Sequence, residues 1–187
     1  MRNQDTPEEK AERLAAAREF QKNNYRTPYL HADSPQVEHF GGSAMCGYTI
    51  NRDAFEVMTG LRLNPKVYEL PPIGQRVIVA LTPQSDKYGD IVIPESTANM
   101  GNNHGWVVSV GSTCDREMPI PGNPQITHPA ELLGLHWYFD LMGGRPLQLG
   151  LSDSEFDAPL RVITARDLWL ADHRPWNDPW DLERTSD

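Results

Sequence analysis

The sequence has few cysteines, no long apolar run and no excess of basic side chains, and each of these absences excludes a class of protein. Its two cysteines, Cys46 and Cys114, lie far apart, so we expect two reduced, buried thiols rather than a disulfide framework. No stretch approaches the ~18 apolar residues of a membrane span, and the N-terminus has no apolar targeting segment. We therefore expect a soluble, cytoplasmic protein.

Basic side chains are outnumbered, with 17 Lys and Arg against 26 Asp and Glu and a net charge of −9. A nucleic-acid partner is not expected, because contact with a phosphate backbone needs clustered Lys and Arg. Residues 1–67 hold nine basic and nine acidic side chains, so the whole deficit lies in residues 68–187. This imbalance favours solubility and attracts basic partners, but it does not specify a fold.

Patterns that carry catalytic chemistry are also lacking. The six histidines, at positions 31, 39, 104, 128, 136 and 173, show no spacing typical of metal ligands, and the neighbours of His104 indicate a loop. There is no glycine-rich phosphate loop, no dinucleotide-binding unit and no nucleophile motif around Ser43 or Cys46. The sequence therefore predicts neither an enzyme nor a metal or cofactor site.

What the N-terminal part does contain is a helix followed by an arm. Thr6-Pro7-Glu8-Glu9 predicts a capped helix that runs to about Asn23, whose Phe20 side should lean on another surface. Residues 25–67 are interrupted by proline and glycine but rich in aromatic residues, so we interpret them as an ordered arm packed on a surface. A second helix is predicted within residues 49–59, ending at Gly60. A flexible linker is the alternative for this arm.

The remainder is typical of β-structure. Short β-branched segments are separated by glycine and proline, among the chain's 14 glycines and 16 prolines, with no helical pattern between them. Strands are predicted at residues 75–81, 105–111, 135–139 and 160–163, followed by a turn at 164–167 and an apolar segment at 168–170. Such a series indicates a small barrel or sandwich.

The order of these segments resembles the GroES-type co-chaperonin family. Pro72 and Arg76-Val77-Ile78-Val79 are similar to its first strand, and Gly89-Asp90-Ile91-Val92-Ile93 is similar to its mobile loop. Gly105 to Gly111 has the family pattern Gly-x-Val-x-x-Val-Gly, and two later segments, at 133–139 and 162–169, complete the order. The resemblance spans about residues 70–172 and implies a mainly β, GroES-like irregular β-barrel, here with an N-terminal helix and an extended arm.

Several features depart from the family pattern. Gly134-Leu135 stands where the family has Gly-Asp, Asp90 replaces a common glycine, and Pro94 follows the apolar triplet directly. Residues 112–131 are longer and richer in proline, and the first 67 residues have no counterpart. Divergence of this kind is common in virus-encoded members, so a bacteriophage origin is consistent with it. We divide the chain into a helix and arm (1–67), a barrel (68–172) and an acidic, tryptophan-containing tail (173–187).

The triplet Ile91-Val92-Ile93 is the candidate binding site. It is apolar within a polar tract, and an exposed apolar patch of this kind needs a partner. Burial of three such side chains gives about 1.5–3 kcal/mol each, against about 1 kcal/mol or more for each loop residue that becomes ordered. One loop therefore binds weakly, and the family compensates with seven copies in a ring. The alternative is that the triplet is another core strand.

Two functions are compatible with these residues. The resemblance implies a homo-heptameric co-chaperonin that caps a GroEL-type chaperonin ring in the cytoplasm, or in the host cytoplasm if a phage encodes it. The alternative is a virion decoration or cement protein that binds capsid proteins, in which the helix, arm and tail contact neighbouring subunits. The apolar triplet favours the first and the long aromatic arm favours the second. In both cases we expect residues 68–172 to fold without the arm.

Overall fold

The part of the chain that the computed structural model describes consists of two α-helices and a mainly antiparallel β-structure. The described residues are 6–24, 33–39, 47–69, 72–82, 87–88, 91–92, 103–114, 128–140, 143–150 and 156–172. The helices are α1 (Pro7–Asn24) and α2 (Arg52–Thr59), with short 3-10 helices η1 (Pro65–Glu69), η3 (Pro129–Leu132) and η5 (Ala165–Asp167). The strands are β1 (Val37–His39), β2 (Tyr48–Ile50), β3 (Arg76–Leu81), β4 (Lys87–Tyr88), β5 (Ile91–Val92), β6 (His104–Val110), β7 (His136–Phe139), β8 (Arg145–Leu147), β9 (Leu160–Thr164) and β10 (Leu168–Asp172).

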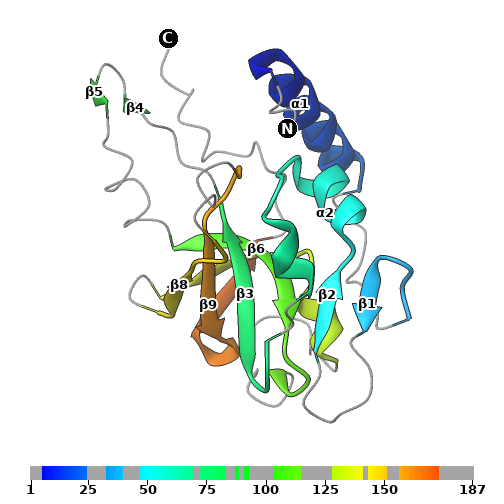
Figure 1. Cartoon of the computed structure of the whole chain (residues 1–187), viewed down its shortest axis with the longest axis vertical. Helices are drawn as coiled ribbons and strands as arrows, with labels where there is room; N and C mark the ends of the chain where they lie inside the picture. The colour runs from blue at the N-terminus through cyan, green and yellow to red at the C-terminus, as the bar shows by residue number, and fades with distance from the viewer. Residues whose placement is uncertain are drawn as a thin grey trace.

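The main sheet has eight strands. Its order is β1-β2-β6-β3-β9-β8, with β7 joined to β6 and β10 joined to β7. All of these pairs are antiparallel. Figure 1 shows β3 and β9 side by side in the middle of the sheet, with α1 and α2 beyond one of its ends. This architecture confirms the predicted mainly β fold with an N-terminal helix, and it is consistent with a GroES-like barrel.

Strand β6 connects the arm to the rest of the sheet because its two edges have different partners. One edge pairs with β3 along most of its length. The other edge pairs with β7 near the start of β6, where Trp106 lies opposite His136, and with β2 near its end, where Val110 lies opposite Tyr48. Tyr48–Ile50, which the sequence placed in the arm, is therefore a strand of the main sheet.

Most predicted elements are present with small shifts. The predicted strands correspond to β3, β6, β7 and β9, and the predicted turn corresponds to η5 in front of β10. The sequence analysis missed the short strands β1, β2, β4 and β8. The helix predicted within residues 49–59 begins only at Arg52, because the residues before it pair with β6 instead.

Helix α2 has the boundaries that its end residues specify. The side-chain oxygen of Asn51 accepts hydrogen bonds from the amides of Asp53 (2.9 Å) and Ala54 (3.4 Å). At the other end Gly60 adopts φ +69°, which favours glycine, and its N–H donates to the carbonyl of Glu56. Both ends of the helix are thus encoded within its own short segment.

Helix α1 begins with a reciprocal capping box. The Glu9 amide donates to the Thr6 hydroxyl at 3.2 Å, and the Thr6 amide donates to the Glu9 carboxylate at 2.8 Å. The helix packs on the end of α2 through Ala17, which is 2% exposed, whereas Phe20 stays 40% exposed. A Cβ on Gly60 would lie 3.1 Å from the Ala17 Cβ, so this glycine also lets the two helices approach closely.

The carboxylate of Asp157 joins α1 to the rest of the fold. Lys10 Nζ lies 2.6 Å from its Oδ1, Arg13 lies 3.1 Å from its Oδ2, and the Arg62 amide donates to Oδ2 at 2.8 Å. Burial alone would raise the pKa of Asp157, but the hydrogen bonds from Lys10 and the Arg62 amide and the charges of Lys10 and Arg13 outweigh it. They hold the pKa below its ordinary value. The ionised carboxylate is therefore the form that fastens α1.

Replacing this carboxylate by an amide should loosen α1 while the sheet stays folded. Hydrogen bonds to charged groups contribute about 1.5–3 kcal/mol, so Asp157→Asn should lower the protection of the α1 amides against hydrogen exchange by about tenfold or more. Glu12→Gln is the matched control, because Glu12 is an exposed carboxylate on the same helix. Unchanged protection in Asp157→Asn would mean that apolar packing alone holds α1.

The same contact should make α1 acid-sensitive. A carboxylate whose pKa is lowered by folding contributes its full stability above its unfolded pKa of about 3.9, and this contribution is lost as the pH falls through the lowered folded value. Protection of α1 amides should therefore decline below about pH 4 in the natural chain. In Asp157→Asn the same decline should be absent, and hydrogen exchange across this range measures the difference.

Residues from the arm fill the centre of the molecule. The apolar side chains of the arm that are at most 1% exposed are Ile50, Phe55, Leu61, Leu63 and Val67. They belong to one apolar core with residues of β3, β6, β7 and β9. Burial also raises the pKa of the neighbouring Tyr68 phenol, which keeps it neutral. The hydrophobic core therefore extends across residue 67, the predicted boundary between the arm and the barrel.

Candidate functional site

The apolar triplet lies in the connection between β3 and β6. Within it, β4 and β5 pair antiparallel, with Tyr88 opposite Ile91 and Lys87 opposite Val92. These two strands form a sheet of their own, separate from the main sheet, and Figure 1 shows them well away from it. Ile93 lies outside the described residues. Ile91 and Val92 are thus not a strand of the main sheet, which was the alternative interpretation; that they bind a partner stays a prediction.

Both ends of this connection are tied to the main sheet at what we call the loop root, which consists of Thr82, Asn103 and His104. The Thr82 amide donates to the carbonyl of His104 at 3.2 Å, which joins the two ends of the loop directly. The Phe139 amide donates to the carbonyl of Asn103 at 2.8 Å, which fastens the returning end to β7. The loop root therefore determines where the loop leaves the sheet.

Three side chains meet at the loop root, and we call them the histidine cluster. The Thr82 hydroxyl lies 2.7 Å from His136 Nε2 and 3.1 Å from His104 Nδ1. The two imidazole nitrogens, His104 Nδ1 and His136 Nε2, are themselves 3.1 Å apart. Each of the three atoms is within hydrogen-bond distance of the other two.

Aromatic rings enclose the histidine cluster. The His136 ring has its centroid 4.8 Å from Trp106, and the His104 ring has its centroid 5.3 Å from Tyr138. His104 and Trp106 are two residues apart on β6, and His136 and Tyr138 are two residues apart on β7, so alternation places all four on one face. His136 is only 9% exposed, so water has little access to its hydrogen bonds.

The sequence analysis did not find this cluster. It placed His104 in a loop, which is wrong, because His104 is the first residue of β6. It also found no relation between histidines 32 residues apart. The available signal was weak: His104 precedes one predicted strand and His136 lies in another, but nothing in the sequence shows that these strands are neighbours.

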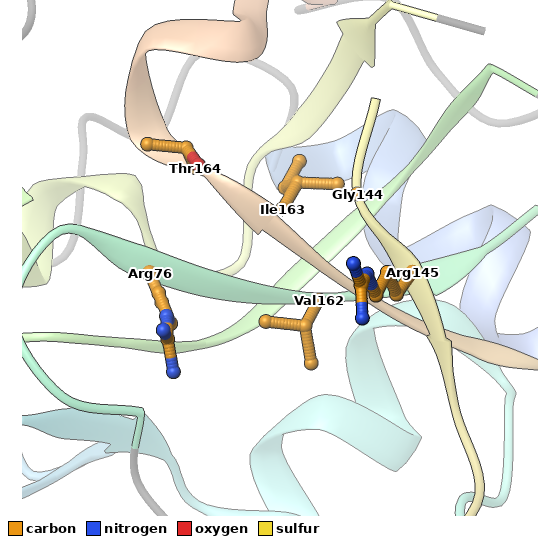
Figure 2. A pocket seen from close by; sticks show the side chains of 6 residues that line it. All are labelled: Arg76, Gly144, Arg145, Val162, Ile163 and Thr164. Atoms are coloured by element: carbon orange, nitrogen blue, oxygen red, sulfur yellow. The ribbon is translucent and has the colours of Figure 1, made fainter. Parts of the chain in front are cut away.

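A second feature is a hollow of about 600 Å³ that is lined by residues of β3, β9 and the beginning of β8 (Figure 2). Arg76 and Arg145 stand on either side of Val162, and Thr164 is the register partner of Arg76. Neither arginine has an ion-pair partner among the described residues, although the chain as a whole is acidic. Both arginines are exposed, so water screens their charges. The hollow lies near the beginning of β3, whereas the loop root lies at the other end of this strand.

Other candidates from the sequence carry no site in the described structure. Cys114 is buried, with its sulfur 3.4 Å from the carbonyl of Arg76, whereas Cys46, His31, His173 and the tail tryptophans lie outside the described residues. In the ranges that the structure covers, no three or more His, Cys, Asp or Glu side chains gather as metal ligands would. In those same ranges no helix is both long and apolar enough to cross a membrane.

The described geometry thus defines a class of protein: a mainly antiparallel β-fold in which a long connection between two neighbouring strands, β3 and β6, carries the apolar triplet. Residues 69–128 match the family described as Chaperonin 10 Kd subunit. The matched segment contains β3, the complete loop and β6, which is the part that bears the candidate site. The match confirms the GroES-type resemblance and supports a co-chaperonin function. No curated protein sequence matches the chain significantly.

Proposed function

We propose that this chain is a co-chaperonin that caps a GroEL-type chaperonin ring by inserting Ile91, Val92 and Ile93 into apolar grooves of that ring. The observation that carries the proposal is the position of the triplet. The triplet lies inside the family-matched segment. Its residues Ile91 and Val92 form strand β5, which pairs with β4 in a hairpin that is separate from the main sheet. An apolar triplet whose strand lies outside the main sheet favours an interaction with a partner.

The hairpin also improves the energetics of binding. Pairing of β5 with β4 orders part of the loop before any partner is present, so fewer residues need to be ordered on binding. The two residues between these strands are Gly89 and Asp90, a combination favoured in two-residue hairpins. This gives a physical reason for Asp90 at a position where the family commonly has a second glycine.

A single loop still binds weakly, so the proposal includes a homo-heptamer. Several loops held in one ring convert later contacts into intramolecular ones, and avidity then exceeds the affinity of any single loop. Such a ring would close over a chaperonin cavity and enclose a folding substrate. For a phage-encoded member, that substrate would be a protein such as its own capsid subunit.

The virion alternative has less support than the co-chaperonin proposal. It relied on an aromatic arm available to neighbouring subunits. In the structure the arm's Phe55 is buried in the chain's own core and Tyr48 pairs with β6, whereas Tyr25, Tyr29 and Phe40 lie outside the described residues. Phe55 and Tyr48 are therefore explained by the fold of one chain, and the loop remains the better-supported interaction site.

A charge placed in the triplet tests the proposal. Ile91→Asp should abolish chaperonin binding, because a carboxylate cannot enter an apolar groove without a large desolvation cost. Ile73→Asp is the matched control, since Ile73 is 57% exposed and lies outside the loop, so the same change there should leave binding intact. Binding is measured by co-sedimentation and electron microscopy with a GroEL-type chaperonin and ATP.

Both variants should keep their circular dichroism spectra and melting temperatures. If Ile91→Asp unfolded the chain, the triplet would be part of the core and the binding-loop assignment would be wrong. If Ile91→Asp bound as well as Ile73→Asp, another surface would make the contact. A complex in which a sevenfold ring of the natural chain caps the chaperonin would support the proposed stoichiometry directly.

A further inference from the structure

We infer that the hollow lined by β3, β9 and β8 is the docking site of the chain's own C-terminal tail, residues 173–187. In this arrangement the Trp180 ring covers Val162. The carboxylates of Asp178 and Asp181 pair with the two arginines on either side of that valine. The tail itself lies outside the described residues, whereas every residue that lines the hollow is described.

The hollow offers an apolar floor between two cations. Val162 is only partly buried on β9, and Figure 2 shows the side chains of Arg76 and Arg145 on either side of it. Both arginines are exposed, and neither forms an ion pair with another described residue. An aromatic ring packs well on a valine, and carboxylates pair with guanidinium groups. The hollow therefore fits a ligand that combines one ring with two carboxylates.

The tail carries this combination within four residues. In Asp178-Pro179-Trp180-Asp181 one indole lies between two carboxylates. With four acidic and two basic side chains, the whole tail has the opposite charge to the hollow. Tryptophan is also the ring that attracts a guanidinium group most strongly, so Trp180 contacts both the apolar floor and its basic borders.

The spacing of the charges agrees on the two sides. Arg76 lies on β3 and Arg145 on β8, the two neighbours of β9, and their register partners on β9 are two residues apart. Strand geometry then separates their Cα atoms by about 12 Å. A segment that contains proline favours an extended helix with three residues per turn, which places Asp178 and Asp181 on one side about 9 Å apart. Long arginine side chains cover the small difference.

The tail is also long enough to reach the hollow. Thr164, which lines the hollow, and Asp172, where β10 ends, are eight residues apart, and Trp180 lies eight residues beyond Asp172. An extended chain spans about 3.3–3.6 Å per residue, so the second eight residues can cover the distance that the first eight cover. The compact η5 shortens the first path, because a 3-10 helix rises only about 2.0 Å per residue.

Weak contacts are sufficient for this docking. Ion pairs of exposed arginines contribute little one by one, since water and salt screen them. The tail is attached to the chain, however, and a short linker gives it an effective concentration of about 1 mM or more. An intrinsic dissociation constant in the millimolar range therefore already fills the hollow for a large part of the time. High salt should empty it.

The Trp180 ring reports occupancy of the hollow in the full-length chain. Fluorine NMR of chain labelled with fluorotryptophan gives separate signals for its five tryptophans, and Trp180→Phe identifies the one of interest. In the parent this signal should differ from that of the same residue in a synthetic peptide of residues 173–187. In Arg76→Ala/Arg145→Ala it should move most of the way to the peptide position. Arg18→Ala is the matched control, because Arg18 is an exposed arginine on α1, and it should leave the signal unchanged.

Changes in the tail test the other side of the contact. Asp178→Asn/Asp181→Asn should also move the Trp180 signal to the peptide position. Glu183→Gln/Asp187→Asn removes the same amount of charge from the tail but spares the docking segment, so this variant should keep the parent signal. Equal signals in the two variants would mean that only the net charge of the tail matters, and would overturn the assigned contacts.

Exchange of the charges separates docking from a general effect on the fold. Arg76→Glu/Arg145→Glu should release the tail, and the addition of Asp178→Lys/Asp181→Lys should restore the bound signal. Because both arginines are exposed, melting temperatures should change little in all of these variants. A parent signal that already equals the peptide signal would overturn the inference, as would a parent signal that Arg76→Ala/Arg145→Ala leaves unchanged.

A mixture of two chains distinguishes the chain's own tail from that of a second copy. Trp180→Phe has an intact hollow and lacks the reporting ring, whereas Arg76→Ala/Arg145→Ala has the ring and lacks the charged hollow. At low micromolar concentration the mixture should show only the released signal. A bound signal would assign the hollow to the tail of a neighbouring copy and overturn docking within one chain. No chaperonin is present in these measurements, so their outcome is independent of the proposed function.

Discussion

A chain that lacks residues 1–67 should be unfolded and insoluble. This expectation reverses the one drawn from the sequence, which was that residues 68–172 fold without the arm. The truncation removes five apolar side chains that are at most 1% exposed, from Ile50 to Val67. Burial contributes about 1.5–3 kcal/mol for each, and their sum is comparable to the whole stability of a typical domain, about 5–15 kcal/mol.

Loss of β2 adds a polar defect to the loss of the core. The Thr49 hydroxyl lies 2.8 Å from the Ser109 hydroxyl, and both side chains are fully buried. Removal of β2 exposes the end of β6 that it covers and takes this partner from Ser109. An open strand edge next to an exposed apolar core promotes aggregation. The truncated chain should therefore fail as a soluble protein and not merely lose stability.

A shorter truncation provides the control. Removal of residues 1–32 deletes α1 but keeps β1, β2, α2 and η1, so this chain should remain soluble and folded, with a lower melting temperature. Solubility, circular dichroism and size-exclusion chromatography distinguish the two truncations. A soluble residue 68–187 fragment that melts cooperatively would show that the barrel completes its core without the arm.

Addition of one methyl group at Gly111 should also cause a large loss of stability. A Cβ at this position would lie closer than 3.0 Å to three backbone atoms of Gly74, whereas real Cβ atoms essentially never approach so closely. Overpacking usually costs about 1–3 kcal/mol, and backbone cannot move aside as a side chain can. We therefore expect Gly111→Ala to cost about 3 kcal/mol and to lower the melting temperature by about 6–12 °C.

Gly150→Ala is the matched control for this change. A Cβ at Gly150 would have no atom within 4 Å, so the melting temperature should hardly change. Differential scanning calorimetry of both variants measures the contrast. Equal melting temperatures would mean that the chain near Gly74 moves aside without cost. The same close approach occurs at Gly105, where the carbonyl of Ala80 is the obstacle, so both glycines of the Gly-x-Val-x-x-Val-Gly pattern have a steric reason.

Features that depend on a few neighbouring residues could be predicted from the sequence alone. Thr6 with Glu9 and Asn51 with Gly60 specify helix ends, because a cap needs only a side chain within about three residues of the backbone group that it satisfies. β-branched segments bounded by glycine and proline likewise specify β3, β6 and β9. The family pattern across this region added the order of the strands and the position of the loop.

Which distant segments contact one another became clear only from the folded chain. The arm joins the core because β2 pairs with β6, about 60 residues further along the chain. The pattern of apolar and polar residues in Tyr48–Ile50 is too short to predict which strand it pairs with. Asp157 meets Lys10 and Arg13 across more than 140 residues. His104 and His136 become a cluster only because β6 and β7 are neighbours. Strand pairing and ion pairing over such separations depend on the packing of the whole chain. They therefore cannot be predicted from short segments of the sequence.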